Sequence, residues 1–209
     1  MILGDRLFEE RMLPRIFNLF YLCILIFDNT GEFMKTFLLV VCCLIFSLGV
    51  NAQQRPLMLY GDTSRVGVPY SKDPHVVNFK GRYLMYHSIP PMKGEPDSGW
   101  NIGIAESKDL MNWTKVGEIT PAPEADYEKK GLCAPGALVK DGKVHLFYQT
   151  YGNGKKDAIC HAISDDGIHF RRNPTNPIFH PAGDWTCGRA IDAEVCEFKG
   201  RYFLYFATR

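Results

Sequence analysis

A strand-rich motif recurs three times in this chain, and the repeat constrains the fold more than any other feature. Each copy opens with a short acidic or small-residue motif, continues to a glycine turn and ends in an aromatic run. The copies cover residues 73–86, 134–148 and 192–205. Their aligned glycines, Gly81, Gly142 and Gly200, are 61 and 58 residues apart. A repeat of this length that is built of strands predicts the blades of a β-propeller or a similar array.

A second motif recurs at the same period. A predicted strand at 101–106 leads into a serine turn at 107–113, and a predicted strand at 159–163 leads into a similar turn at 164–170. Each unit therefore reads as four strands: an inner strand, an aromatic strand, a strand before the serine turn and a fourth after it. Since the third copy begins near Asp192, we expect an all-β fold with about two and a half blades in this chain.

The composition is that of an ordinary globular protein. The 209 residues are 46% hydrophobic and 22% charged, with a net charge of +1, which argues against disorder and against nucleic acid as a partner. Aromatic residues reach 13%, which favours strands.

The first 52 residues differ from the rest. Apolar runs at 16–27 and 37–48 are each shorter than the roughly 20 residues that span a bilayer. The second run follows Met34 and Lys35 and ends in a small-residue cleavage site up to Ala52, so residues 34–52 are expected to be a signal peptide. Translation would then begin at Met34, with 1–33 an upstream extension and 53–209 an exported domain, periplasmic or extracellular, without stable membrane insertion. The alternative is a membrane-anchored N-terminus that contains both runs.

The expected mature region contains four cysteines, at positions 133, 160, 187 and 196. Export permits disulfides, but four cysteines allow three pairings, and buried free thiols are the alternative. Their spacing matches no zinc motif, and no His, Cys or Asp cluster has ligand spacing. We therefore expect no metal and no other cofactor.

The motifs at 71–75, 134–136 and 189–193, with their Gly-Lys/Arg-Tyr strands and serine turns, resemble those of five-bladed propeller glycosidases. Among these glycosidases, the motifs most resemble those of glycoside hydrolase family 43, which is part of the furanosidase-like group that includes the fructosidases and family 117. The resemblance covers residues 57–209 and implies a five-bladed β-propeller. It also implies that Asp73 is the general base and that Asp192 orients the acid and tunes its pKa. The family's general acid, a glutamate of the next blade, would lie beyond Arg209, so we expect this chain alone to be inactive.

The chemistry agrees with that implication. Glycosidic cleavage needs one protonated carboxyl and one ionised carboxylate, and carboxyl groups crowded on one axis push each other's pKa values apart. The alternative for Asp73 and Asp192 is structural, because aspartates also accept hydrogen bonds in turns.

Four further residues are candidates for substrate binding. His75 shares a strand face with Asp73, and Glu194 shares one with Asp192. Glu194 could alternatively replace the missing acid, although it aligns with His75 and not with the aspartates. Trp100 and Trp185 lie in or beside loops, where they could stack on sugar rings.

We therefore expect a glycoside hydrolase, inverting by its family resemblance, whose partner is an oligosaccharide or polysaccharide of plant or algal origin. One alternative is a non-catalytic carbohydrate-binding propeller, and another is a truncated product without activity.

Overall fold

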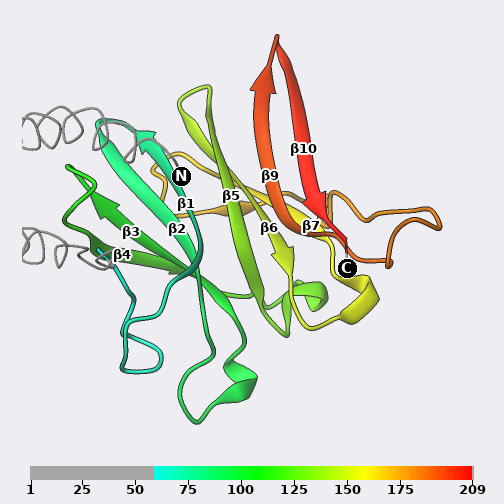
Figure 1. The fold of residues 1–209 in the computed structure, drawn as a ribbon, viewed down its shortest axis with the longest axis horizontal. Coiled ribbons are helices and arrows are strands. Elements are labelled where there is room, and N and C mark those ends of the chain that lie inside the picture. Colours follow the sequence, from blue (N-terminus) through cyan, green and yellow to red (C-terminus); the bar gives the residue numbers. More distant parts are fainter. Residues whose placement is uncertain (1–58, 209) are drawn as a thin grey trace, which may run out of the picture. The chain divides into compact units, whose positions relative to one another are not determined.

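The computed structural model describes residues 59–208, and the proposed extension and signal peptide lie outside this part. Its strands form three antiparallel sheets, drawn in chain order in Figure 1. The first sheet contains β1 (Lys72–Phe79), β2 (Arg82–Ile89), β3 (Asn101–Ser107) and β4 (Thr114–Ile119). The second contains β5 (Leu132–Lys140), β6 (Lys143–Thr150), β7 (Ile159–Ser164) and β8 (Arg171–Arg172). The third is a hairpin of β9 (Ile191–Phe198) and β10 (Arg201–Ala207).

This architecture confirms the expected all-β fold with two four-stranded blades and part of a third. The inner strands β1, β5 and β9 lie side by side in that order (Figure 1). Helical structure within residues 59–208 is limited to three short 3-10 helices, at Pro96–Ser98, Asp126–Glu128 and Gly154–Lys156. None of the helices described is long and apolar enough to cross a membrane.

The first two strands of every blade are joined by a two-residue turn. The turn pairs are Lys80 with Gly81, Asp141 with Gly142, and Lys199 with Gly200, and all six residues have positive φ. Positive φ at both central residues defines the type I′ turn, whose twist matches that of the flanking strands. The three glycines that align the repeats in the sequence therefore recur because the second position of each turn needs a positive φ.

The serine turns also have the same geometry in both blades. Ser107 Oγ accepts hydrogen bonds from the amides of Asp109 and Leu110, and Asp109 Oδ1 accepts from two amides further on. Ser164 and Asp166 repeat this pattern. Backbone and side-chain hydrogen bonds from Asn112 chiefly lower the pKa of Asp109, as expected for a carboxylate that accepts several N–H groups. These turns are structural.

The main hydrophobic core lies between the first two blades. Leu84, Tyr86 and Ile104 of the first blade and Leu146 and Tyr148 of the second are all fully buried within it. At roughly 1.5–3 kcal/mol for each large side chain removed from water, this core dominates the stability of the blade pair. A smaller cluster around Ile159, Ala190 and Ala193 joins the second blade to the third.

A buried ion pair joins Glu128, in the segment between the first two blades, to Arg172 in β8 of the second blade. Glu128 is fully buried and accepts hydrogen bonds from Arg172 Nη2 at 3.0 Å and from Arg172 Nε at 3.2 Å. The Tyr148 hydroxyl also donates to Glu128, at 2.5 Å, and the amide of Ala122 donates at 2.9 Å. Because every oxygen of this carboxylate has partners, its burial is tolerated.

All four cysteines of the described part are free thiols, so none of the three possible pairings is formed there. Cys133 and Cys160 are buried in strands, whereas Cys196 is exposed.

Candidate active site

The inner strand of each blade is irregular at the same point. The pairing of β1 with β2 shifts between Lys72 and His75, and that of β5 with β6 shifts between Cys133 and Gly136. In the third blade the pairing of β9 with β10 shifts where Ile191 faces Ala207 and Glu194 faces Tyr205. Each shift is a β-bulge, which bends a strand and redirects a side chain.

One residue in each bulge has a left-handed backbone. Asp73, Ala134 and Asp192 have φ values of 50°, 48° and 54°. This conformation is unfavourable for residues other than glycine, and it persists where surrounding structure holds it. Two of the three positions carry an aspartate, as the repeat predicted, and the structure shows that all three share one unusual geometry.

Asp73 is half-buried and held by two neighbours. Lys72 Nζ lies 3.3 Å from Asp73 Oδ2, and the Ser88 hydroxyl lies 3.2 Å from the same oxygen. Both contacts meet the same carboxylate oxygen, so they hold the Asp73 side chain in one orientation.

Asp192 is more open to solvent than Asp73. Its backbone amide donates a hydrogen bond to Gln149 Oε1 of the second blade, at 2.8 Å. The side chain is free to meet a ligand.

The charges of the two aspartates act on two shared neighbours, Cys133 and Lys72. Burial raises the pKa of the Cys133 thiol to about 12, and the carboxylates of Asp73 and Asp192 both add to the increase. Burial opposes the charge of Lys72, but Asp73, with a further contribution from Asp192, raises the pKa of Lys72 above its usual value. Aspartates of the first and third blades therefore act on the same two residues, and Cys133 stays a neutral thiol.

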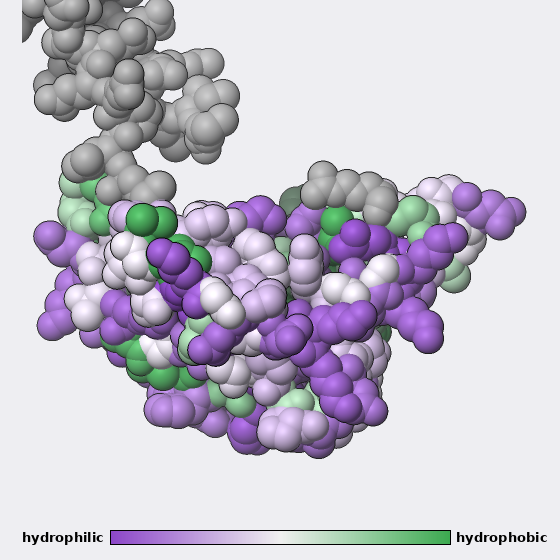
Figure 2. Space-filling view, turned by 90° about the horizontal axis from the view of Figure 1, so that it is seen from below, coloured by the Kyte–Doolittle hydropathy of each residue, from purple (hydrophilic) through white to green (hydrophobic). Residues whose placement is uncertain are grey.

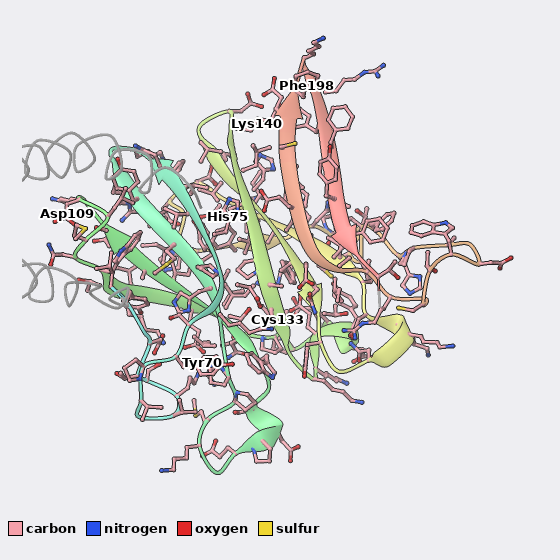
Figure 3. The ribbon with its side chains drawn as sticks, in the orientation of Figure 1. Tyr70, His75, Asp109, Cys133, Lys140 and Phe198 are labelled. Atoms are coloured by element: carbon pink, nitrogen blue, oxygen red, sulfur yellow. The ribbon has the colours of Figure 1, made fainter. Side chains whose placement is uncertain are left out.

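His75 and Glu194 contact each other across the second blade. His75 Nδ1 lies 3.2 Å from Glu194 Oε2, and the exposed fractions of the two side chains are 22% and 53%. Between them lies Gly136, where a Cβ atom would stand 2.3 Å from the carbonyl oxygen of Ala193 and 3.4 Å from Glu194 Oε2. The absence of a side chain at Gly136 lets β9 approach β5 closely. Figure 3 labels His75 and Cys133 in the middle of the described part, away from Lys140 and Phe198 at the hairpin ends.

The two predicted tryptophans have different surroundings. Trp100 lies beside the aspartate site, because Lys72 Nζ is 5.9 Å from the centre of its ring. Its ring also packs against Tyr70 at 6.0 Å and Tyr151 at 5.8 Å between centroids. Trp185 is 71% exposed and packs on Phe206 of the third blade. The structure therefore places Trp100 near the Lys72 ammonium that contacts Asp73, and it places Trp185 in a separate aromatic contact. Hydrophilic residues cover most of the face seen in Figure 2.

Sequence reasoning missed three residues that touch the site: Lys72, Ser88 and Gln149. Ser88 and Gln149 face the residues that precede the bulges, since Ser88 pairs with Lys72 and Gln149 pairs with Cys133. A signal did exist for Ser88 and Gln149, because both are polar residues seven positions after the turn glycine, near the buried ends of β2 and β6. Among residues 59–208, no group of three or more His, Cys, Asp or Glu side chains is arranged to hold a metal ion. The catalytic and binding roles of Asp73, Asp192, His75, Glu194, Trp100 and Trp185 stay predictions.

Comparison with solved structures supports the fold. The chain is similar to a family 117 glycoside hydrolase from Zobellia galactanivorans, with a TM-score of 0.55 and 19% identity, over 65% of this chain and 47% of that one. It is similar to the family 32 β-fructofuranosidase of Bombyx mori, with a TM-score of 0.54 and 20% identity, over 66% and 30%. An endo-arabinase of Bacteroides thetaiotaomicron gives a TM-score of 0.52 and 22% identity, over 66% and 45%. The expected propeller architecture is thereby confirmed.

Sequence relatives narrow the family. The chain is 30% identical over 112 residues to a sucrose-6-phosphate hydrolase of Zymomonas mobilis, which covers 49% of this chain and 21% of the relative. It is 31% identical over 112 residues to the Escherichia coli protein of the same name, which covers 49% and 23%. The chain thus spans about a fifth of the length of these curated relatives. Family 43, named in the sequence analysis, is not confirmed.

The model of the glycosyl hydrolases family 32 N-terminal domain matches residues 69–209, which is more than half of the chain. The match begins just before β1 and contains every strand of the three blades. The chain belongs to the glycosyl hydrolase family 32 N-terminal domain family.

Proposed function

We propose that this protein hydrolyses the glycosidic bond of a fructose-containing sugar such as sucrose, at the inner-strand site around Asp73 and Asp192. The observation that carries the proposal is the repeated left-handed bulge, which presents an aspartate from the first blade and another from the third. Membership of family 32 and the relatives that are sucrose-6-phosphate hydrolases support a fructoside as the substrate.

The neighbours of each aspartate suggest its role. Asp73, beside the Lys72 ammonium and the Ser88 hydroxyl, is the ionised carboxylate that directs water or attacks the anomeric carbon. Asp192 is more exposed and orients the sugar from the opposite blade. The pair of His75 and Glu194 contacts sugar hydroxyls, and Trp100 stacks on a ring. Trp185, 71% exposed, is proposed as a more distant sugar contact.

The activity is proposed for the whole protein, because this chain spans about a fifth of its curated relatives. The 209-residue chain alone is proposed to bind sugar without hydrolysing it. Two four-stranded sheets and a hairpin do not form a closed ring, and Glu194, the acid nearest to Asp192 on β9, is engaged by His75. Export through a signal peptide at 34–52 is likewise proposed.

The test is hydrolysis by the protein expressed from its complete reading frame, with sucrose, sucrose 6-phosphate and an aryl arabinoside as substrates. We expect release of fructose from sucrose or its 6-phosphate, and we expect Asp73→Asn to lower kcat by about 10²–10⁴-fold. Asp141→Asn is the matched control, because Asp141 has the same left-handed backbone (φ 50°) in a hairpin turn. Fructosides bound without turnover would support the carbohydrate-binding alternative, and full activity of Asp73→Asn would refute the proposal.

Two further measurements separate the finer claims. Turnover by the 209-residue chain that Asp73→Asn abolishes would contradict its proposed inactivity. Proton NMR of the first sugar released shows whether the anomeric configuration is inverted, as the family 43 resemblance implied. A separation of about 6.5–9.5 Å between the reacting carboxyl groups corresponds to inversion, and about 5–5.5 Å corresponds to retention.

A further inference from the structure

The bulged residues of the second and third blades share one kind of partner. The amide of Ala134 donates a hydrogen bond to Ser88 Oγ at 2.8 Å, and the amide of Asp192 donates to Gln149 Oε1, also at 2.8 Å. In each case the acceptor belongs to the preceding blade. The same side-chain-to-backbone contact thus joins the first blade to the second and the second blade to the third.

The two acceptors are equivalent in the repeat. Ser88 faces Lys72 across the hairpin, and Gln149 faces Cys133, and both partners stand immediately before a bulged residue. Both acceptors are buried, with exposed fractions of 0% for Ser88 and 4% for Gln149. In the third blade Ala207 faces Ile191 and has no polar side chain. A polar acceptor is thus present at this position in the two blades that are followed by another described blade.

These hydrogen bonds answer a need that the bulge creates. The extra residue of a bulge is left out of the strand ladder, so its amide requires another partner. Ala134 has no polar side chain that could hydrogen-bond its own left-handed backbone. This conformation therefore persists only where neighbouring residues hold it. A buried acceptor from the preceding blade supplies both the partner and the support.

Ser88 performs a second task at the same time. A hydroxyl has one donor and two acceptor sites, so Ser88 can accept from Ala134 while it donates to Asp73 Oδ2 at 3.2 Å. The Asp73 carboxylate is thereby linked through one side chain to the backbone of the next blade. Gln149 continues the connection from the second blade to the backbone of Asp192.

We propose that Ser88 and Gln149 are positioning residues, which fix the placement of Asp73 and Asp192 relative to each other across three blades. Their kinetic consequence rests on the proposed function, whereas their structural consequence does not. Loss of either side chain would leave the site residues present but misplaced. A displacement of about 1 Å can lower a rate by about 10²-fold without weakening substrate binding equally.

The structural arm of the test measures amide hydrogen exchange by NMR in the 209-residue chain. Ser88→Ala should accelerate exchange at Ala134, and Gln149→Leu should accelerate it at Asp192, each by up to about tenfold. Ser88→Thr and Gln149→Glu keep an acceptor oxygen and should retain protection. Ser107→Ala is the matched control, because it removes a buried hydroxyl of the same blade at a serine turn. Unchanged exchange at Ala134 in Ser88→Ala, or equal acceleration in Ser107→Ala, would overturn the inference. If Ser88→Ala does not fold, Gln149→Leu and the retained protection in Ser88→Thr decide the same question.

The kinetic arm uses the protein from its complete reading frame. Ser88→Ala should lower kcat by about 10- to 100-fold with KM changed by less than about twofold, and Ser88→Thr should recover most of the rate. A rise in KM with unchanged kcat would overturn the positioning role. If the unmodified protein cleaves no fructoside, the proposed function fails, and the exchange measurement still decides whether the two side chains hold the bulges.

Discussion

Gly136→Ala tests the close approach of the inner strands that forms the candidate site. A Cβ atom at this position would stand 2.3 Å from the carbonyl oxygen of Ala193, which belongs to the backbone of β9. Real Cβ atoms do not come so close, and a strand backbone cannot move aside as the end of a side chain can. The third blade must therefore shift away from the second.

The expected cost follows from this geometry. Overpacking of a well-packed interior costs about 1–3 kcal/mol, and contact with backbone places Gly136→Ala near the upper end. For a protein of this size, 1 kcal/mol changes Tm by about 2–4 °C, so we expect thermal unfolding to occur about 4–12 °C lower. Glu194 should also separate from His75, because it follows Ala193 on β9 and would move with the displaced strand.

The assay is thermal unfolding followed by circular dichroism, with Gly117→Ala as the matched control. A Cβ at Gly117 would lie 3.0 Å from Ile168 Cγ2, the end of a side chain that can adjust. Gly117→Ala should change stability by less than about 1 kcal/mol. A Gly136→Ala protein as stable as the control would refute the packing of β5 against β9 described above.

Three further changes test other parts of the structure. Ala134→Gly should raise Tm by about 1–4 °C, because relief of about 1–2 kcal/mol at a left-handed residue exceeds the greater chain entropy of glycine. Arg172→Met should lower the free energy of unfolding by about 3–5 kcal/mol in urea titrations, because it leaves the buried Glu128 carboxylate without its cation, and Arg172→Lys should lower it less. Burial lowers the pKa of His87 to about 4. As pH falls from about 6.5 to 4, His87 is therefore protonated in the unfolded chain but stays neutral in the folded chain. Stability should decrease by up to about 3 kcal/mol over that range, and His87→Phe should reduce the decrease, whereas an unchanged pH profile would contradict this account.

Much of the fold is predictable from local sequence. The expected strand at 101–106 is β3 (Asn101–Ser107), and the expected strand at 159–163 is β7 (Ile159–Ser164). Strand alternation and the glycine turns are local signals, because side-chain direction and turn φ depend on neighbouring residues. The repeat then extends these signals from one blade to the next.

The bulges and their partners are not local features. The Asp73–Pro74 and Ala134–Pro135 motifs look like ordinary strand beginnings, and their left-handed backbone is maintained by contacts with other strands. In the sequence, Ser88 and Gln149 look like core residues of aromatic strands, because their hydrogen-bond partners belong to the next blade. The contact between His75 and Glu194 likewise depends on how closely three blades pack around Gly136. Sequence could align these positions, but it could not show that they meet.

The family assignment likewise depends on more than local motifs. Three motifs at blade spacing indicate a propeller glycosidase, yet each motif is only a few residues long and Asp-Pro is a common pair. The match that identifies family 32 extends over residues 69–209. Family identity therefore depends on the whole pattern of strands and loops, and not on the aspartates alone.

The central claim is that Asp73 and Asp192 converge on one sugar, and a crystal structure of the protein with bound sucrose or fructose tests it most directly. We predict a fructosyl ring within hydrogen-bonding distance of both carboxylates, with His75 and Glu194 beside it. A sugar bound elsewhere, or a sugar that contacts only one of the two aspartates, would contradict the claim.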